Sequence, residues 1–231
     1  AVKIYTIIKQ FINAVVGVAL PRLSYYLGQN DKGKYNALLT KLMHSLMLLI
    51  FPSIVGIIMV GKKIIILIAG KEFEDGYLAL CILSVAIIFA VLSFLYVYGI
   101  MIPYGNERKC LISTVIAATT NVVLNFLFIP AMSLNGAAIT TVISEILVLA
   151  TSMYFSRGLY KIGVIWKMFL PCGVGCVSVF IVCLIINSLK LPTITSLAIA
   201  VICSSIVYVA ILVLLKDEIT QDIVRSFLRR K

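Results

Sequence analysis

Long apolar runs with almost no charge constrain this chain more than any other feature of its sequence. A helix needs roughly 20 apolar residues to cross the hydrocarbon core of a bilayer. Seven runs of about that length occur between short polar connections, at about 4–27, 42–60, 77–103, 111–130, 136–155, 169–189 and 194–215. With 62% hydrophobic and 13% charged residues, the chain is too apolar for a water-soluble domain. The sequence therefore predicts a membrane-embedded protein.

The runs are dense in Leu, Ile and Val and lack the period-two alternation of membrane-barrel strands. Their internal Gly and Pro residues are ordinary for membrane helices, where neighbouring groups satisfy the freed backbone. We expect an all-α membrane protein, a polytopic helical bundle of about seven transmembrane helices. The connections are too short for a sizeable soluble domain.

The formal net charge of +11 is explained by where the cations lie. Most of them occupy alternate connections and the C-terminal end: Arg22, Lys32, Lys34, Lys41, Arg108, Lys109, Arg157, Lys161, Lys167, Lys216, Arg225, Arg229, Arg230 and Lys231. The positive-inside rule places these on the cytoplasmic side. The basic excess therefore reports topology, with affinity for anionic membrane lipids as its only further implication, and gives no support for nucleic-acid binding.

The two ends of the chain carry their own signals. Seven spans with a cytoplasmic C-terminus put the N-terminus outside, yet Ala1 is not a methionine and no signal peptide follows it. We expect the chain to be the C-terminal part of a longer membrane protein. Residues 216–231 have the pattern of a basic amphipathic helix on the inner leaflet.

One face of the first run is polar. Thr6, Lys9, Asn13, Gly17 and Pro21 recur at spacings of three or four residues. Such a stripe is costly against lipid, so it lines either a wet cavity or another polar helix, and we expect the cavity. Snorkelling to the outer headgroups is the alternative for Lys9, which lies about two turns into the run.

The second run repeats this pattern more weakly. Lys41 and His44 lie one turn apart near its cytoplasmic end, and His44, the only histidine, titrates near neutral pH when unperturbed. We expect both residues at the substrate cavity, while a place in the cytoplasmic headgroup zone is the alternative for His44.

Polar residues also gather in the fourth and fifth runs, which a short turn joins. Asn121 and Asn125 are one turn apart, and Thr141 and Glu145 follow on the returning helix. Antiparallel packing brings these groups to a similar depth, where their oxygens suit a hard cation such as Na⁺. Interhelical hydrogen bonding is the alternative for the asparagines and the threonine. Glu145 either pairs with a cation or takes up a proton.

No motif supports catalysis. The sequence has no nucleotide-binding loop and no nucleophile with its base, so we expect no enzyme and no bound cofactor apart from a coupling ion, Na⁺ or H⁺. The six cysteines lie in or beside the apolar runs with no usual zinc spacing, which favours helix packing over a metal site or a disulfide.

Five stretches occur in the order seen in one group of membrane transporters: "VALPRLS", "FPSIVGIIMVGKKIIILIAGKEF", "MIPYGNERK", "TNVVLNFLFIP" and "NGAAITTVISE". In these the chain resembles the bacterial flippases of O-antigen and capsule repeat units. That family belongs to the superfamily of multidrug, oligosaccharidyl-lipid and polysaccharide exporters. The resemblance covers most of residues 1–157 and, more loosely, the last two runs.

The resemblance implies two six-helix lobes around a central cavity. Residues 1–157 would form the second lobe without its first helix, 158–215 two additional C-terminal helices, and 216–231 a cytoplasmic tail. The missing N-terminal lobe would complete the transporter. The substrate would be an oligosaccharide on undecaprenyl pyrophosphate, flipped across the bacterial cell membrane from the inner to the outer leaflet by alternating access.

The resemblance also bears on the candidate residues. Lys9, Asn13 and Arg22 correspond to a cavity-lining helix, where Arg22 would meet the phosphate of the bilayer or of the cargo. Asn121, Asn125 and Thr141 match the sodium-site pattern of lipid II flippases, although Asn125 is an amide where those proteins have a carboxylate. A cation-coupled multidrug extruder on the same scaffold, a membrane-bound polysaccharide polymerase or acyltransferase, and a lipid-binding scaffold are the alternatives in function.

Overall fold

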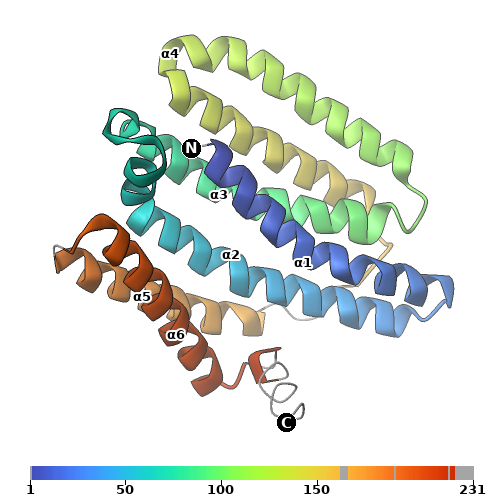
Figure 1. Cartoon of the computed structure of the whole chain (residues 1–231). Helices are drawn as coiled ribbons and strands as arrows, with labels where there is room; N and C mark the ends of the chain where they lie inside the picture. The colour runs from blue at the N-terminus through green and yellow to red at the C-terminus, as the bar shows by residue number, and fades with distance from the viewer. Residues whose placement is uncertain (1, 162–165, 190, 218, 222–231) are drawn as a thin grey trace. The chain divides into compact units, whose positions relative to one another are not determined.

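The computed structural model describes residues 2–161, 166–189, 191–217 and 219–221, and these form helices without any strand (Figure 1). The elements are α1 (Val2–Gly28), α2 (Lys32–Ala69), the 3₁₀-helix η1 (Lys71–Phe73), α3 (Gly76–Phe94), the π-helix η2 (Leu95–Met101), α4 (Glu107–Phe155), α5 (Trp166–Ser188) and α6 (Thr193–Leu214). Six helices in the described ranges are long and apolar enough to cross a membrane. The predicted all-α membrane fold is confirmed.

Helix α4 consists of two arms. Its 49 residues would measure about 74 Å if straight, more than twice the hydrocarbon core of a bilayer. Ser133 leaves the helical conformation with φ 49° and ψ −124°, and Figure 1 shows α4 folding back there. A Cβ on Gly136 would run into the carbonyl group of Phe128, so only glycine fits where the arms meet. The fourth and fifth runs are thus separate segments, as predicted.

The chain divides into two compact units, each described here by itself. Unit 1 comprises Ala1–Leu46 and Asp75–Gly163, and unit 2 comprises Met47–Glu74 and Val164–Lys231. Helix α2 supplies residues to both. The division into functional segments 1–157, 158–215 and 216–231 stays a prediction, and most of the expected amphipathic tail, 222–231, lies outside the described residues.

Helix α2 is longer than the second run, which the sequence placed at about 42–60. It begins at Lys32 because Asp31 caps it, with Oδ1 accepting the backbone N–H of Lys34 at 3.0 Å. The Lys34 ammonium lies 2.9 Å from Oδ2, and this hydrogen bond lowers the pKa of Asp31. Tyr35 and Leu39 of the added turns are fully buried, so packing stabilises the extension.

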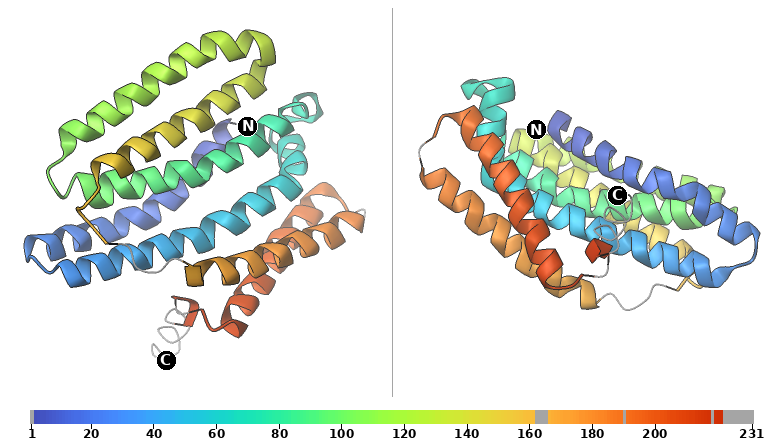
Figure 2. Two further views of the ribbon diagram at one scale, coloured as in Figure 1. Left: turned by 180° about the vertical axis from the view of Figure 1, so that it is seen from behind. Right: turned by 60° about the horizontal axis from the view of Figure 1, so that its bottom comes forward.

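Unit 1 is centred on α3, which packs against α1 and α4 (Figures 1 and 2). The interior is formed by fully buried side chains such as Val16 and Leu23 of α1 and Ile87 of α3. Close packing matters here because lipid tails are as apolar as these side chains, which leaves little hydrophobic driving force.

Unit 2 joins the antiparallel α5 and α6, side by side in both figures, to the second half of α2. Lys63 of α2 donates from Nζ to Oδ1 of Asn187 at 2.7 Å and to Oγ of Ser196 at 2.6 Å. These bonds tie the end of α2 to the connection between α5 and α6.

Two tyrosine hydroxyls replace backbone donors that prolines remove. Pro52 cannot donate to the carbonyl oxygen of Leu48, and Tyr208 of α6 donates to that oxygen at 2.7 Å. Pro103 follows η2 and leaves the carbonyl oxygen of Gly99 in the same position, where Tyr35 donates at 2.7 Å. Each unit thus satisfies a proline-freed carbonyl with a side chain from another helix.

Replacing Tyr208 by Phe is expected to destabilise the protein by about 1–3 kcal/mol, because a buried carbonyl loses its donor. Pro52→Ala restores the amide donor inside α2, so Tyr208→Phe should cost much less in that background. Thermal unfolding in detergent micelles measures both effects, with Tyr154→Phe as a control, since Tyr154 is 61% exposed. Equal losses in both backgrounds would contradict this interpretation.

Candidate functional site

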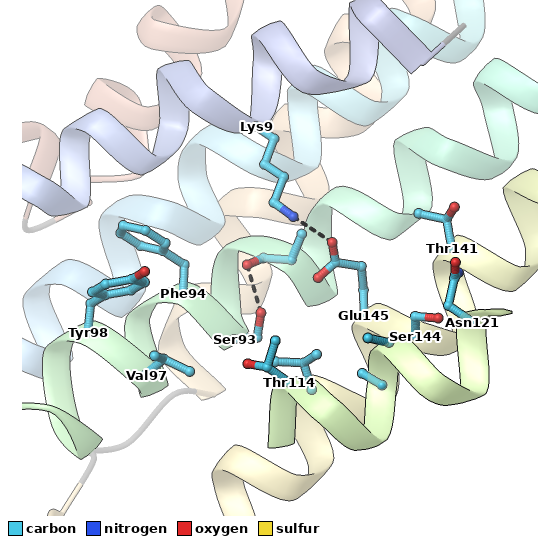
Figure 3. Close-up of a pocket in the computed structure, with 14 residues that line it drawn as sticks. Lys9, Ser93, Phe94, Val97, Tyr98, Thr114, Asn121, Thr141, Ser144 and Glu145 are labelled. Carbon is cyan, nitrogen blue, oxygen red and sulfur yellow. Dashed lines mark hydrogen bonds and ion pairs between the residues drawn. The ribbon is translucent and has the colours of Figure 1, made fainter. Parts of the chain in front are cut away.

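A partly buried ion pair of unit 1 joins α1 to the second arm of α4. Lys9 Nζ lies 2.5 Å from Oε1 of Glu145, and the two side chains keep only 28% and 15% exposure. The hydroxyl of Tyr5, one turn before Lys9, donates to the same oxygen at 2.9 Å. Figure 3 shows Lys9 reaching from α1 toward Glu145. This geometry fits the prediction that Glu145 pairs with a cation, and that cation is a lysine of the same chain.

The ion pair borders a pocket of about 470 Å³ that lies entirely within unit 1. The pocket falls within the size range of small-molecule sites, about 300–1,000 Å³. Side chains from α1, α3, η2 and both arms of α4 form its wall: Lys9, Ala90, Ser93, Phe94, Val97, Tyr98, Thr114, Ala117, Ala118, Asn121, Thr141, Ser144, Glu145 and Val148. Phe94 and Tyr98 lie on one side in Figure 3, opposite Asn121 and Thr141.

The two asparagines of α4 form a hydrogen-bonded chain. Asn125 Nδ2 donates to Oδ1 of Asn121 at 3.0 Å, and Thr140 Oγ1 donates to Oδ1 of Asn125 at 2.6 Å. Thr141, the threonine selected from the sequence, instead donates to the carbonyl of Ala137 and lines the pocket. Three of the four predicted cation-site residues thus share one pocket: Asn121, Thr141 and Glu145. Asn125 does not line this pocket but is hydrogen-bonded to Asn121.

The other predicted cavity residues lie outside this pocket. Asn13 is half-buried on the face of Lys9, and its buried Oδ1 has no hydrogen-bond partner within the described ranges. Arg22 and Lys41 are exposed and His44 is half-buried. A role of these four residues toward substrate stays a prediction.

Several residues of the ion pair and the pocket wall were not predicted from the sequence. Tyr5 carries a usable signal, because it precedes Lys9 by four residues on the same helical face. Ser93, Phe94 and Tyr98 carry none, since they occur in an evenly apolar run. The π-helix η2 directs Val97 and Tyr98 to the pocket, and π-helical turns are frequent at functional sites.

The fold and this site together define a class: a polytopic helical membrane protein with a polar pocket and a partly buried charge pair, as membrane transport proteins have. The family model for lipid II flippase MurJ matches residues 4–204. The chain therefore belongs to this flippase family.

Known proteins resemble the chain over part of their length. Capsular polysaccharide biosynthesis protein CapF of Staphylococcus aureus is 27% identical over 150 residues, 65% of this chain and 38% of CapF. The probable low-salt glycan biosynthesis flippase Agl15 of Haloferax volcanii is 26% identical over 135 residues, 58% of this chain and 28% of Agl15.

A solved structure, lipid II flippase MurJ in an inward closed conformation, has the same fold. It gives a TM-score of 0.64 at 16% identity and covers 96% of this chain and 46% of the MurJ chain. The chain thus spans less than half the length of each of these three proteins.

Proposed function

We propose that this chain is part of a flippase that moves an undecaprenyl-pyrophosphate-linked oligosaccharide repeat unit from the inner to the outer leaflet by alternating access. The match to the flippase family over residues 4–204 carries this proposal. Two relatives named for capsular polysaccharide and glycan biosynthesis support a cell-surface polysaccharide as the end product. Flipping breaks no covalent bond, so the protein is not an enzyme. None of the relatives reported above is named as a drug extruder or a polymerase.

The proposed organisation follows the family. Residues 1–157 work as a transport lobe together with an N-terminal lobe of the same protein, which the 46% coverage of the MurJ chain supports. Residues 158–215 add two helices, and 216–231 lie at the cytoplasmic surface. The distribution of Lys and Arg supports a cytoplasmic C-terminus in the bacterial cell membrane.

Complementation tests this function. The intact gene should restore surface polysaccharide to a strain that lacks its capsule flippase. Replacing Arg22 by Ala should then reduce export roughly tenfold at unchanged protein level, because one charge-assisted hydrogen bond to the cargo phosphate is lost. Quantitative detection of surface polysaccharide, normalised to membrane protein, gives the readout.

Lys32→Ala is the matched control for Arg22→Ala. Lys32 is also an exposed cation of the first cytoplasmic connection, so its loss changes the positive-inside charge equally. Undiminished export in the Arg22 variant, or an equal reduction in both variants, would show that Arg22 acts only in topology. Failure of the intact gene to restore export would count against the flippase itself.

We further propose that a Na⁺ or H⁺ gradient drives the cycle through Asn121, Asn125, Thr141 and Glu145. The shared pocket and the single carboxylate within it support this site. Dissipating one of the two gradients with a selective ionophore should reduce export severalfold. Export that persists when both gradients are collapsed would remove coupling through these residues.

A further inference from the structure

We propose that the unit 1 pocket binds a neutral sugar residue of the transported glycan, and not its pyrophosphate or an acidic sugar. This inference rests on the proposed flippase function and names the part of the substrate that the pocket would bind. The charge, the hydrogen-bond polarity and the aromatic wall of the pocket each favour the same class of ligand.

The charge of the pocket is already balanced. Among the described residues of its wall, Lys9 is the only cation and Glu145 the only carboxylate, and the two are paired. An oxyanion would have to displace Glu145 from Lys9 and would then lie beside an uncompensated carboxylate. Both steps are unfavourable at low exposure, where charges are poorly screened. A neutral ligand leaves the pair intact.

The serine and threonine hydroxyls of the wall present acceptors. Each uses its only proton within its own helix: Ser93 to Ala90 O at 2.9 Å, Thr114 to Cys110 O at 3.0 Å, Thr141 to Ala137 O at 2.8 Å and Ser144 to Thr140 O at 2.8 Å. A hydroxyl that donates in this way keeps lone pairs for other donors. Sugar hydroxyls supply such donors, whereas phosphate diesters and carboxylates at neutral pH supply only further acceptors.

The complementary donor comes from an amide. Asn121 lines the pocket, and its Oδ1 accepts from Asn125 while its amide nitrogen keeps its protons for other acceptors. A sugar hydroxyl both donates and accepts, so it matches this mixed lining in a way that an ion of either sign does not.

One wall of the pocket is aromatic. The rings of Phe94 and Tyr98 have centroids 4.4 Å apart with a tilt of 34°, and Tyr98 is 44% exposed. A flat apolar surface opposite polar groups suits a sugar ring, which carries C–H groups on its faces and hydroxyls on its edge. A phosphate group gains nothing from such a wall.

A bare cation is a poorer occupant of this conformation. A hard cation requires several oxygen ligands, each at about 2.4 Å from the ion. A pocket of about 470 Å³ is much larger than such a coordination shell. The Lys9 ammonium also occupies Oε1 of Glu145. A coupling ion would therefore enter in a state in which the pair is open, whereas a sugar requires no opening.

Two matched probes test the proposal with the intact protein in lipid nanodiscs. Methyl glucoside and methyl glucuronide differ only in the carboxylate at C6, and saturation-transfer NMR gives the affinity of each. We expect the glucoside to bind and the glucuronide to bind at least about fivefold more weakly. Thr114→Val and Ser144→Ala should each weaken glucoside binding about fivefold, the effect of one hydrogen bond. Glu145→Gln should make the glucuronide bind more tightly than the glucoside, because Lys9 has then lost its carboxylate partner and can pair with the carboxylate of the probe.

Ser113→Ala is the control, because Ser113 makes the same intrahelical bond as Thr114, at 3.0 Å to Lys109 O, but is buried and does not line the pocket. Size-exclusion profiles verify folding of every variant. Equal or tighter binding of the glucuronide to the wild-type protein would overturn the proposal. Unchanged glucoside affinity in both hydroxyl variants would also overturn it.

Export assays on the same variants separate this proposal from the flippase function. Normal export by a protein that does not bind the glucoside would overturn the sugar pocket alone. Glucoside binding that depends on Thr114 and Ser144 would support the pocket even if the intact gene failed to restore export, and that failure would count against the flippase assignment only.

Discussion

Replacing Lys9 by Met is expected to destabilise the protein by about 3 kcal/mol, the lower end of the range for breaking a buried ion pair. The variant leaves the Glu145 carboxylate, 15% exposed, with the Tyr5 hydroxyl as its one remaining partner among the described residues. We choose the lower end because Lys9 itself keeps 28% exposure. Thermal unfolding of the purified protein in detergent micelles measures the loss, and export should fall with it.

The double variant Lys9→Met with Glu145→Gln should recover most of that stability. Without the carboxylate no charge is left unpaired, and Tyr5 can still donate to the amide oxygen of a glutamine. The two substitutions should therefore be strongly non-additive in a double-mutant cycle. If the single and the double variant unfold at the same temperature, Lys9 is not held by Glu145, and the charge argument for a neutral ligand loses its basis.

Replacing Gly136 by Ala should cost about 3 kcal/mol, the upper end of the usual range for overpacking. The new Cβ would meet the backbone carbonyl of Phe128, which cannot rotate away as a side chain can. The two arms of α4 must then separate, which also displaces Thr141 and Glu145 on the second arm. Unfolding in detergent micelles measures the effect.

Gly173→Ala provides the matched control, because a Cβ on this helical glycine of α5 has no atom within 4 Å. Alanine also has the higher helix propensity, so this variant should be neutral or slightly stabilising. Similar losses in both variants would show that contact with Phe128 is not the cause.

Local pattern was sufficient to predict the helices and the hairpin within α4, because run length and turn residues act over short distances. The start of α2 was mispredicted because hydropathy does not record tertiary packing. Its first turns are polar in sequence, yet Tyr35 and Leu39 are buried by tertiary packing. Hydropathy alone does not detect helix that continues beyond the apolar run.

The site was predictable only in part. Lys9 and Glu145 were identified separately, as charges too costly to face lipid, but 136 positions separate them and no spacing rule pairs them. Thr140 and Thr141 are adjacent, and only the rotation of the second arm decides that Thr140 meets Asn125. The aromatic wall depends on η2, whose π-helical turn no local pattern in this run indicates.

The two tyrosine–proline pairs have a consequence for how this sequence can change over evolutionary time. Loss of Tyr208 or Tyr35 alone leaves a backbone carbonyl without its hydrogen-bond donor. Loss of the matching proline instead restores a backbone N–H of the same helix that can donate to that carbonyl. The tyrosine therefore becomes dispensable only after the proline has gone. Positions 52 and 208, and positions 103 and 35, should vary together among homologues, with proline retained only where a hydroxyl faces it.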